Sequence, residues 1–476
     1  SIFTKQGDAV FIKALTSYQA ATIGCFMGSG HASASGDASA AAGAAATTSA
    51  GSADCNGEVN FNHFNILRAI GRGAFGKVCI VQKKDTEKMY AMKYMSKQIC
   101  IEKGAVKNVI KEIQILADLD FPFLVNMWYT FQDQEDMFVV VDLLLGGDLR
   151  YHIQHNVRFS EASLRLYLAQ MGLALDYLYT KHILHRDIKP DNLIFDEAGN
   201  VFLTDFNVAA VLLDNKMATE VSGTKPYMAP EVFQTGLKEI PGYSYAADWW
   251  SLGVTIFELA RCRRPFDIGS HLSLADCLSA IRSGNVHYPS AASPELRSVL
   301  MSLLEQDPGL RLSSLQMLRS HSFMRGLDWP GVLAKTVKPV FAPPKHQLNC
   351  DPTYELEEMI IESKPLHKKK KRLAKLADKC AVEDTPMSKA LNELNTRFLT
   401  FNRDRVASAA PAELGNASGA IGSNSQNLNA STERQKSLSS SKIASQAAGE
   451  SNSRPSVIAG RSGARSCSSP TPVQIK

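Results

Sequence analysis

The spacing of apolar positions changes along the chain, from strand-like in the first part of its central region to helix-like in the second. The polar stretch 132–136 predicts a hairpin, and apolar residues at helical spacing predict one helix at 106–116. The strand-like runs are short, rich in β-branched and aromatic residues and bounded by polar or glycine-containing turns; they lie at residues 64–67, 78–81, 89–94, 128–131 and 137–141.

From Leu149 onward the pattern is mainly helical. A helix is predicted at 163–180, a β-rich stretch follows at 193–203, and a long buried helix begins at Asp248. The ordered pattern ends near residue 323. A small β-rich part followed by a larger helical part predicts an α+β fold with two lobes and a ligand cleft between them.

Both ends of the chain have compositions that do not favour a folded core. Residues 28–57 are mostly Ala, Ser and Gly, and the last seventy or so are rich in Ser, Ala, Asn and Gln. Such segments bury too little apolar surface to offset their chain entropy. We therefore predict a disordered low-complexity segment over 1–58, a globular domain over 64–324, a C-terminal tail over 325–405 and a disordered Ser-rich tail over 406–476.

Charge and cysteine usage narrow the class of protein. The formal net charge is only +5, from 52 Lys and Arg against 47 Asp and Glu, so no nucleic-acid binding is expected. The nine cysteines form no CxxC pair, which favours reduced thiols inside a cell. No apolar run reaches the roughly 18 residues of a membrane span. We expect an intracellular protein, most simply cytoplasmic, with nuclear or membrane-peripheral location as the alternatives.

The candidate chemistry centres on the loop His185-Arg186-Asp187-Ile188-Lys189-Pro190-Asp191-Asn192. An Asp followed five residues later by an Asn suits phosphoryl transfer, because the carboxylate orients an attacking hydroxyl and the amide oxygen reaches a metal on the phosphates. The spacing alone also fits a polar surface turn. Asp205, after the next β-rich stretch, is a second candidate metal ligand.

A glycine-rich stretch precedes this loop, with Gly71, Gly73 and Gly76 followed by Val78. A dinucleotide-binding fold needs a helix after such glycines, whereas here a β-branched run continues. The pattern therefore favours a hairpin that covers the phosphates of ATP.

A buried lysine on the third predicted strand needs an anionic partner. Lys93 is that lysine, and Glu112 in the 106–116 helix is the better candidate partner than Glu102, which lies before the periodic stretch. The pair would place the ammonium on the α- and β-phosphates of ATP.

The ordered set of these motifs, with Asp205-Phe206 and Ala229-Pro230-Glu231, resembles the eukaryotic protein kinases. Residues 138–152, 204–207, 223–231 and 349–375 resemble more closely the serine/threonine-protein kinase 32 (YANK) family of the AGC group. The resemblance implies the bilobal protein kinase fold, with a kinase domain over 64–324 and an AGC-like tail over 325–405. It also implies an ATP-dependent serine/threonine kinase that uses Mg²⁺ or Mn²⁺ and acts as a monomer on protein substrates.

The resemblance also assigns roles to single residues. Catalysis is assigned to Asp187, Lys189, Arg186 and Thr224, and metal binding to Asn192 and Asp205. ATP binding is assigned to Ile70, Gly71, Gly73, Gly76, Val78, Ala91, Lys93, Glu112, Val141, Asp142, Leu144 and Asp148. Asp248 is expected to brace the catalytic loop, and Glu231 to pair with Arg311.

Three departures leave questions open. Asn207 replaces the Gly of Asp-Phe-Gly; Asn is among the few other residues that tolerate a left-handed backbone, but the replacement puts the flipping of this segment in doubt and is the one argument for a non-catalytic binding module. Glu220 replaces a phosphorylatable Thr, so we expect activity without phosphorylation of this segment. Asp148, Asp191 and Glu258 favour basic flanks in the substrate, whereas Lys225 and the arginines at 261, 263 and 264 favour acidic ones.

Two further segments carry weaker patterns. Phe398 and Phe401 fit either an amphipathic surface helix or a motif that docks on the small lobe. Membrane contact is expected only through a myristoylation-like site at Gly28 or through the basic run Lys368–Lys375, for which a solvated surface is the simpler interpretation.

Overall fold

The computed structural model describes residues 58–72, 76–213, 216–288, 291–345, 349–350 and 386–409. The predictions for Gly28, Gly73 and the basic run Lys368–Lys375 lie outside these residues. So do the predicted disordered segments up to residue 57 and from residue 410 onward.

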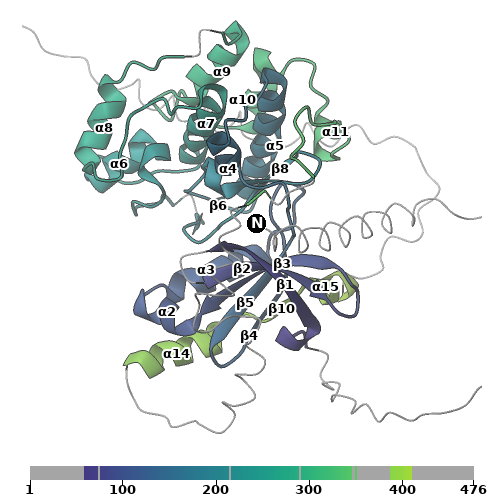
Figure 1. The fold of residues 1–476 in the computed structure, drawn as a ribbon. Coiled ribbons are helices and arrows are strands. Elements are labelled where there is room, and N and C mark those ends of the chain that lie inside the picture. The colour runs from purple at the N-terminus through teal and green to yellow at the C-terminus, as the bar shows by residue number, and fades with distance from the viewer. Residues whose placement is uncertain are drawn as a thin grey trace, which may run out of the picture. The chain divides into compact units, whose positions relative to one another are not determined.

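The first lobe is built on one antiparallel sheet (Figure 1), whose strands are rich in β-branched and aromatic residues. A cluster on one face includes Phe64, Val81, Tyr129 and Phe138. The strand order is β1-β2-β3-β5-β4-β10, with β1 (Phe64–Arg72), β2 (Gly76–Lys83), β3 (Met89–Ser96), β4 (Met127–Gln132), β5 (Asp136–Val141) and β10 (Phe401–Asn402).

Two helices accompany this sheet, α2 (Lys97–Glu102) and α3 (Val106–Ala117). Ser96 caps α2, because its side chain accepts a hydrogen bond from the N–H of Ile99. In α3 the apolar residues that predicted the helix are buried, and Glu112 is buried with them. The helix predicted at 106–116 is confirmed.

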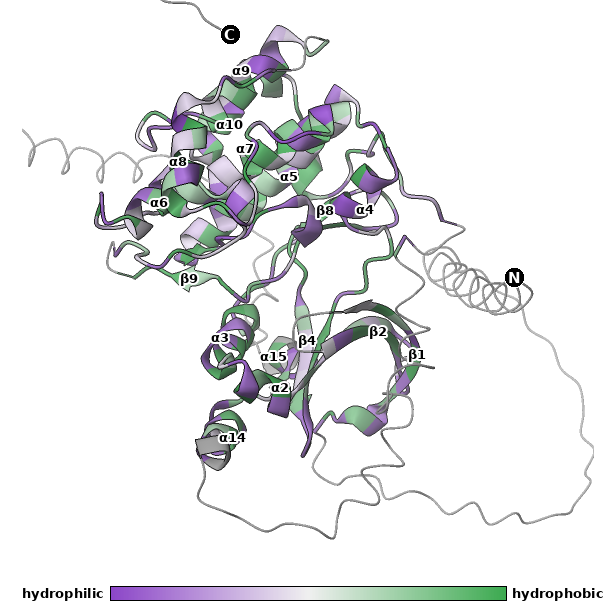
Figure 2. Cartoon of the chain, turned by 60° about the vertical axis from the view of Figure 1, so that its left-hand side comes forward, coloured by the Kyte–Doolittle hydropathy of each residue, from purple (hydrophilic) through white to green (hydrophobic). Residues whose placement is uncertain are grey.

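The second lobe is mainly helical, as predicted. In its centre α5 packs on α7, and Figure 2 shows hydrophobic residues concentrated where these helices lie. Its helices are α4 (Leu149–Gln154), α5 (Glu161–Thr180), α6 (Pro230–Gly236), α7 (Ala246–Arg261), α8 (Leu274–Ser283), α9 (Pro294–Leu303), α10 (Leu315–Ser320) and α11 (Trp329–Leu333).

Two short strand pairs carry the loops of the candidate active site. β6 (Ile183–Leu184) pairs with β9 (Ala210–Val211), and β7 (Leu193–Phe195) pairs with β8 (Val201–Leu203). Four 3-10 turns complete the described elements: η1 (Phe61–His63), η2 (Pro190–Asn192), η3 (Lys225–Tyr227) and η4 (Ser322–Met324).

The two lobes are joined by backbone as well as by side chains. The N–H of Val125 donates to the carbonyl of Leu203 at 3.0 Å, and Leu124 forms a parallel bridge with Leu203. One hydrophobic cluster runs from Val139 in β5 through to the helices of the second lobe. The sheet is therefore anchored on the strand that leads to Asp205.

The tail returns to the first lobe. The helix α14 (Pro386–Arg397) contacts α2 and α3, and β10 adds a strand at the β4 edge with Phe401 opposite Thr130. Leu394 and Phe398 are buried in the main hydrophobic cluster. The interpretation of this segment as a docking motif is confirmed, and the amphipathic helix is the element that docks.

The predicted start of the disordered tail at residue 406 is wrong by a few residues. The helix α15 (Arg403–Ala409) crosses that boundary. Its first turn is supported by Asn402, whose side-chain oxygen accepts a hydrogen bond from the N–H of Asp404 at 3.1 Å. The helix therefore runs to Ala409, past the predicted boundary.

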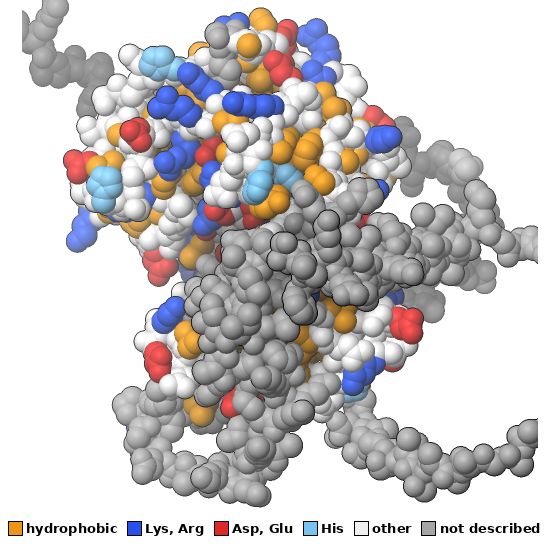
Figure 3. All heavy atoms as spheres, viewed as in Figure 1, with side chains coloured by type: hydrophobic (Ala, Val, Ile, Leu, Met, Phe, Trp, Pro, Cys, Tyr) orange, Lys and Arg blue, Asp and Glu red, His pale blue; other side chains and the backbone are white. Residues whose placement is uncertain are grey.

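The described surface carries both signs of charge, and on the face in Figure 3 Lys and Arg side chains lie among Asp and Glu. Within the described ranges, no helix combines the length and the apolar character that crossing a membrane requires.

Candidate active site

The loop that carries Asp187 is held by a buried carboxylate of α7. Asp248 accepts hydrogen bonds from the N–H groups of His185 at 2.7 Å and Arg186 at 2.8 Å, which confirms the predicted brace. Burial raises the pKa of Asp248, although these donors and the nearby Arg186 act in the opposite direction. The brace fixes a strained backbone, because Arg186 has a φ of 71°.

The segment after Asp205 crosses this loop at a glycine. Gly223 has a φ of +112°, and a Cβ there would lie 2.2 Å from the carbonyl oxygen of Arg186. A larger residue would push the two segments apart. Gly223 therefore brings Thr224 next to Asp187.

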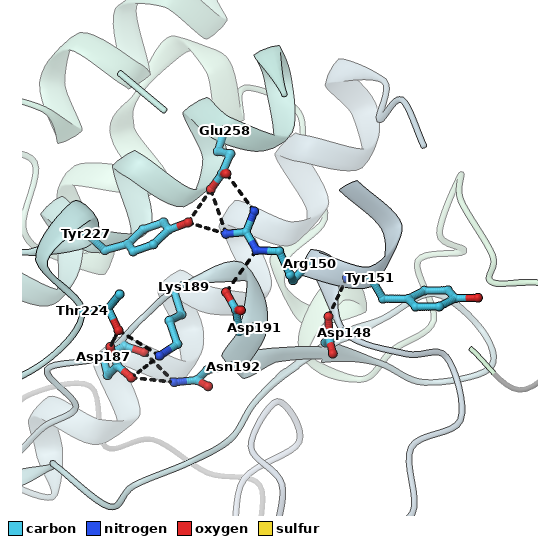
Figure 4. A network of polar contacts seen from close by, with 10 residues as sticks. All are labelled: Asp148, Arg150, Tyr151, Asp187, Lys189, Asp191, Asn192, Thr224, Tyr227 and Glu258. Carbon is cyan, nitrogen blue, oxygen red and sulfur yellow. Dashed lines mark hydrogen bonds and ion pairs between the residues drawn. The ribbon is translucent and has the colours of Figure 1, made fainter. Parts of the chain in front are cut away.

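Asp187 sits at the centre of a polar network drawn in Figure 4. The hydroxyl of Thr224 donates to Oδ1 at 2.6 Å, and Nζ of Lys189 contacts Oδ2 at 2.7 Å. Nζ of Lys189 also lies 2.9 Å from the hydroxyl of Thr224, and Nδ2 of Asn192 donates to the Asp187 carbonyl at 2.8 Å. Thr224 therefore contacts both Asp187 and Lys189.

Asn192 and Asp205 supply oxygen atoms of the kind that hard divalent cations prefer. The amide nitrogen of Asn192 is committed to Asp187, which leaves its oxygen as the free end of the amide. Among the described residues no group of three or more His, Cys, Asp or Glu is arranged to hold a metal ion. The two residues therefore fit a metal whose other ligands come from elsewhere, as with ATP phosphates.

The structure changes the role expected for Asn207. The left-handed backbone lies at Asp205, with a φ of 70°, and Asn207 is not among the residues with positive φ. Nδ2 of Asn207 instead donates to Oδ1 of Asp205 at 2.8 Å. Asn207 is thus a side-chain support for Asp205, and its left-handed tolerance is not used.

Lys93 and Glu112 form the predicted ion pair. Nζ of Lys93 lies 3.0 Å from Oε1 of Glu112, although the two residues belong to β3 and α3. Burial alone would lower the pKa of Lys93, but the carboxylates of Glu112 and Asp205 outweigh it and raise the pKa. Lys93 is therefore charged; it is paired with Glu112 and lies close enough to Asp205 for that carboxylate to favour its charge.

The glycine-rich hairpin is the antiparallel pair of β1 and β2, with Gly71 opposite Val78, and on its other side β2 places Val78 opposite Lys93 of β3. A Cβ on Gly76 would lie 1.8 Å from the carbonyl oxygen of Tyr94, so the backbone approach requires glycine. A Cβ on Gly71 would meet only Val78, at an ordinary 3.7 Å. Close packing therefore explains Gly76 but not Gly71.

The connector between the lobes begins at Val141, which pairs with Ala91 in β3. Ile70, Val141 and Leu144 are partly buried, and Ala91 is buried. The carboxylate of Asp142 does not face this group, because it accepts hydrogen bonds from the N–H of Asn126 at 2.9 Å and from Nε1 of Trp128 at 2.6 Å. Any contact of Asp142 with a nucleotide would therefore come from its backbone.

Asp148 also has an internal role. Its side chain caps α4 by accepting from the N–H of Tyr151 at 2.7 Å, and burial raises the pKa of its carboxyl.

Glu220 faces Arg186 but only loosely. The guanidinium Nη1 of Arg186 lies 3.6 Å from Oε2 of Glu220, and the Glu220 side chain is 78% exposed against 6% for Arg186. Arg186 has a closer partner in the carbonyl of Val208, to which its Nε donates at 2.6 Å. Burial and the charge of Arg186 lower the pKa of Lys111 in α3, so a second cation lies near this pair.

Sequence reasoning missed two cations around the site, Lys111 and Arg150. Lys111 immediately precedes Glu112 in α3, but successive helix positions point about 100° apart, so the sequence carried no signal that it lies near Arg186. Arg150 binds Glu258 in α7, a contact between residues 108 positions apart that no sequence spacing indicates. The predicted pair of Glu231 and Arg311 is confirmed, with Nη2 of Arg311 at 2.9 Å from Oε2.

Comparisons with known proteins agree with this geometry. The protein kinase domain family model matches residues 64–324. Human serine/threonine-protein kinase 32B is 53% identical over 358 residues, covering 74% of this chain and 86% of that protein. Human serine/threonine-protein kinase 32C is 52% identical over 355 residues, 73% of each chain. A RAC family serine/threonine-protein kinase homolog of Dictyostelium discoideum is 35% identical over 288 residues, 60% of this chain and 63% of that protein.

Proposed function

The chain belongs to the protein kinase family, and its relatives include serine/threonine-protein kinases. We propose that its Asp187 centre transfers the γ-phosphoryl group of ATP to serine and threonine hydroxyls of proteins. The observation that carries the assignment of this centre is the network of Thr224, Lys189 and Asn192 around Asp187. Residues 64–324 would be the kinase domain and 325–405 its tail.

Asp187 would act as the base that orients the acceptor hydroxyl and takes its proton. Thr224 holds Oδ1 and Lys189 holds Oδ2, so the carboxylate is fixed in orientation before a substrate arrives. The ammonium of Lys189 would also stabilise negative charge on the phosphoryl group as it is transferred.

Lys93 would hold the α- and β-phosphates, because Glu112 orients its ammonium and the nearby carboxylates keep it charged. Protein kinases use a divalent cation, and here Asn192 and Asp205 would hold it. When bound, the cation would neutralise charge on the phosphates. We propose Mg²⁺ as this ion, with Mn²⁺ as the substitute, since the candidate ligands are all oxygen atoms.

Adenine would lie between the hairpin and the connector. Ile70, Val78 and Ala91 would contact it from the sheet, and Val141 and Leu144 from the connector. Backbone groups near Asp142 would provide its hydrogen bonds, since the carboxylate of Asp142 is occupied by Asn126 and Trp128.

Transfer of labelled γ-phosphate from ATP to a generic protein acceptor tests this proposal. Asp187→Asn should lower turnover by about 10²-fold to 10⁴-fold, the usual contribution of a general base. Asp267→Asn, at an exposed position, is the matched control and should retain turnover. Chelation of divalent ions should abolish transfer and added Mg²⁺ should restore it. Equal labelling by wild type and Asp187→Asn would contradict the role of Asp187.

We further propose that the protein works as a cytoplasmic monomer on protein substrates rather than on nucleic acid. The small net charge and the odd number of cysteines without CxxC spacing support this. Sedimentation of the purified protein would test the monomer.

A further inference from the structure

Near Asp187, the guanidinium of Arg150 binds two carboxylates of the protein itself, those of Glu258 and Asp191 (Figure 4). Nη1 of Arg150 in α4 donates to Oε1 of Glu258 in α7 at 2.9 Å, and Nε of Arg150 lies 3.3 Å from Oδ2 of Asp191 in η2. The guanidinium also donates to the hydroxyl of Tyr227, which in turn donates to Oε2 of Glu258 at 2.6 Å. Three separate elements therefore converge on one guanidinium.

The exposure of these groups shows what a substrate would meet. The side chain of Glu258 is 7% exposed and that of Arg150 24%, whereas Asp191 is 46% exposed. The deep carboxylate is thus covered by Arg150, and only Asp191 presents an accessible oxygen. The carboxyl of Asp148 is also engaged, because it caps α4.

The position of this cluster places it beside the path of a peptide substrate. Asp191 is four residues after Asp187 on the same loop, and its neighbour Asn192 donates to Asp187 at 2.8 Å. An extended peptide advances about 3.3 Å per residue, so a residue two to four positions from the acceptor would reach this region.

Two adjacent carboxylates without an internal partner would bind an arginine of the peptide through charge-assisted hydrogen bonds. Here an incoming guanidinium would have to displace Arg150 from a buried contact or bind Asp191 alone. Both alternatives reduce the gain from a peptide arginine, because displacement would leave Arg150 without its partner.

We propose that Arg150 is a specificity-determining residue, which fills the Glu258–Asp191 pair in place of a substrate arginine and so directs the kinase to serines and threonines without arginine on the adjoining flank. The inference rests on the proposed function of the Asp187 centre. It defines the substrate class, peptides without an arginine on that flank, from the contacts of one residue of the protein.

A positional peptide library with labelled ATP tests the proposal in the full-length chain. For each position around the acceptor, the measured quantity is the rate with Arg divided by the rate with Ala. For the wild type this ratio should be about 1 at every position. In Arg150→Ala it should rise about fivefold at one or two neighbouring positions, the net size of about one ordinary hydrogen bond. The double variant Arg150→Ala/Glu258→Gln should lose most of the rise.

Controls separate this effect from damage to the fold. Arg282 of α8 forms an exposed ion pair with Glu239, far along the chain from Arg150, and Arg282→Ala should leave the ratios unchanged. Arg150→Gln keeps a hydrogen-bond donor for Glu258 without the charge, so it serves if Arg150→Ala does not fold. A wild type that already selects Arg fivefold, or variants whose ratios match the wild type, would overturn the proposal. Absence of transfer by the wild type to any peptide would instead count against the Asp187 centre.

Discussion

Two residues at the centre of the site, Arg186 and Asp205, have backbone conformations that residues other than glycine rarely adopt, with φ values of 71° and 70°. Each has a hydrogen-bond partner: the N–H of Arg186 donates to the distant Asp248, and the side chain of Asp205 accepts a hydrogen bond from the nearby Asn207. Such conformations are typical of functional sites, where the surrounding structure maintains the strain. The side chains of the site are therefore held ready by the scaffold.

At the residue scale the first prediction concerns Glu220. Glu220→Ala should lower turnover about twofold to fivefold, because the variant removes the carboxylate near Arg186 and Lys111. The effect should be small, since the pair is 3.6 Å apart and Glu220 is largely exposed. The measurement is the initial rate of peptide phosphorylation.

Thr219→Ala is the matched control for Glu220→Ala. If the segment needs no phosphorylation, as proposed, this variant keeps the wild-type rate. A Glu220→Ala rate equal to the wild type, or loss of activity in Thr219→Ala, would contradict the role given to Glu220.

At the scale of elements, the tail is part of the first lobe. Nζ of Lys97 in α2 donates to the side chain of Asn395 at 2.7 Å, and the guanidinium of Arg403 donates to the carbonyls of Met127 at 2.6 Å and Leu119 at 2.7 Å. β10 also covers the edge of β4, which would otherwise expose unpaired backbone groups. The contacts with α3 link the tail to the helix that holds Glu112.

Shortening Phe398 should therefore destabilise the protein. Phe398→Ala should lower the free energy of unfolding by about 3 to 5 kcal/mol, because the ring is buried against the first lobe. Leu399→Ala, whose side chain is 39% exposed, is the adjacent control and should cost much less. Thermal or chemical unfolding measures both.

Removal of the chain from Ala390 onward should also lower the free energy of unfolding. It should weaken ATP binding as well, since α14 packs on α2 and α3. Unchanged unfolding of Phe398→Ala would show that the tail contributes little to the lobe.

At the scale of the whole molecule, the nucleotide would bind groups from both lobes. Lys93 lies on the sheet, and Asn192 and Asp205 lie on loops of the helical lobe, yet Asp205 is close enough to raise the pKa of Lys93. A ligand that binds only the folded state adds a free energy of RT ln(1 + [L]/Kd) to the stability of the protein, which grows with the free ligand concentration.

ATP with Mg²⁺ should therefore raise the unfolding temperature of the wild type and of Asp187→Asn, which retains the phosphate-binding groups. At a ligand concentration 100 times Kd the added stability is about 2.7 kcal/mol. Lys93→Met should lose most of this shift, because the ammonium that faces Glu112 and Asp205 is gone. Lys84→Met, at an exposed position after β2, is the control. An undiminished shift in Lys93→Met would contradict phosphate binding by Lys93.

The two-lobed plan and most of the candidate site could be predicted from the order of residues alone. Periodicity found α3, α5 and the strands of the sheet, since local side-chain spacing reflects which face is buried. Motif spacing found Asp187, Asn192 and Asp205, because the chemistry requires these residue types close together on one or two loops.

Contacts between residues far apart in the chain could not be predicted and were found only in the folded molecule. The docking of Phe398 on the first lobe, the closure of Arg150 on Glu258 and the turn of Asp142 toward Trp128 depend on which surfaces pack together. The support that Asn207 gives to Asp205 is local, but it depends on a backbone strain at Asp205 that composition does not encode. These contacts depend on packing across the whole molecule, so they cannot be predicted from any short stretch of sequence.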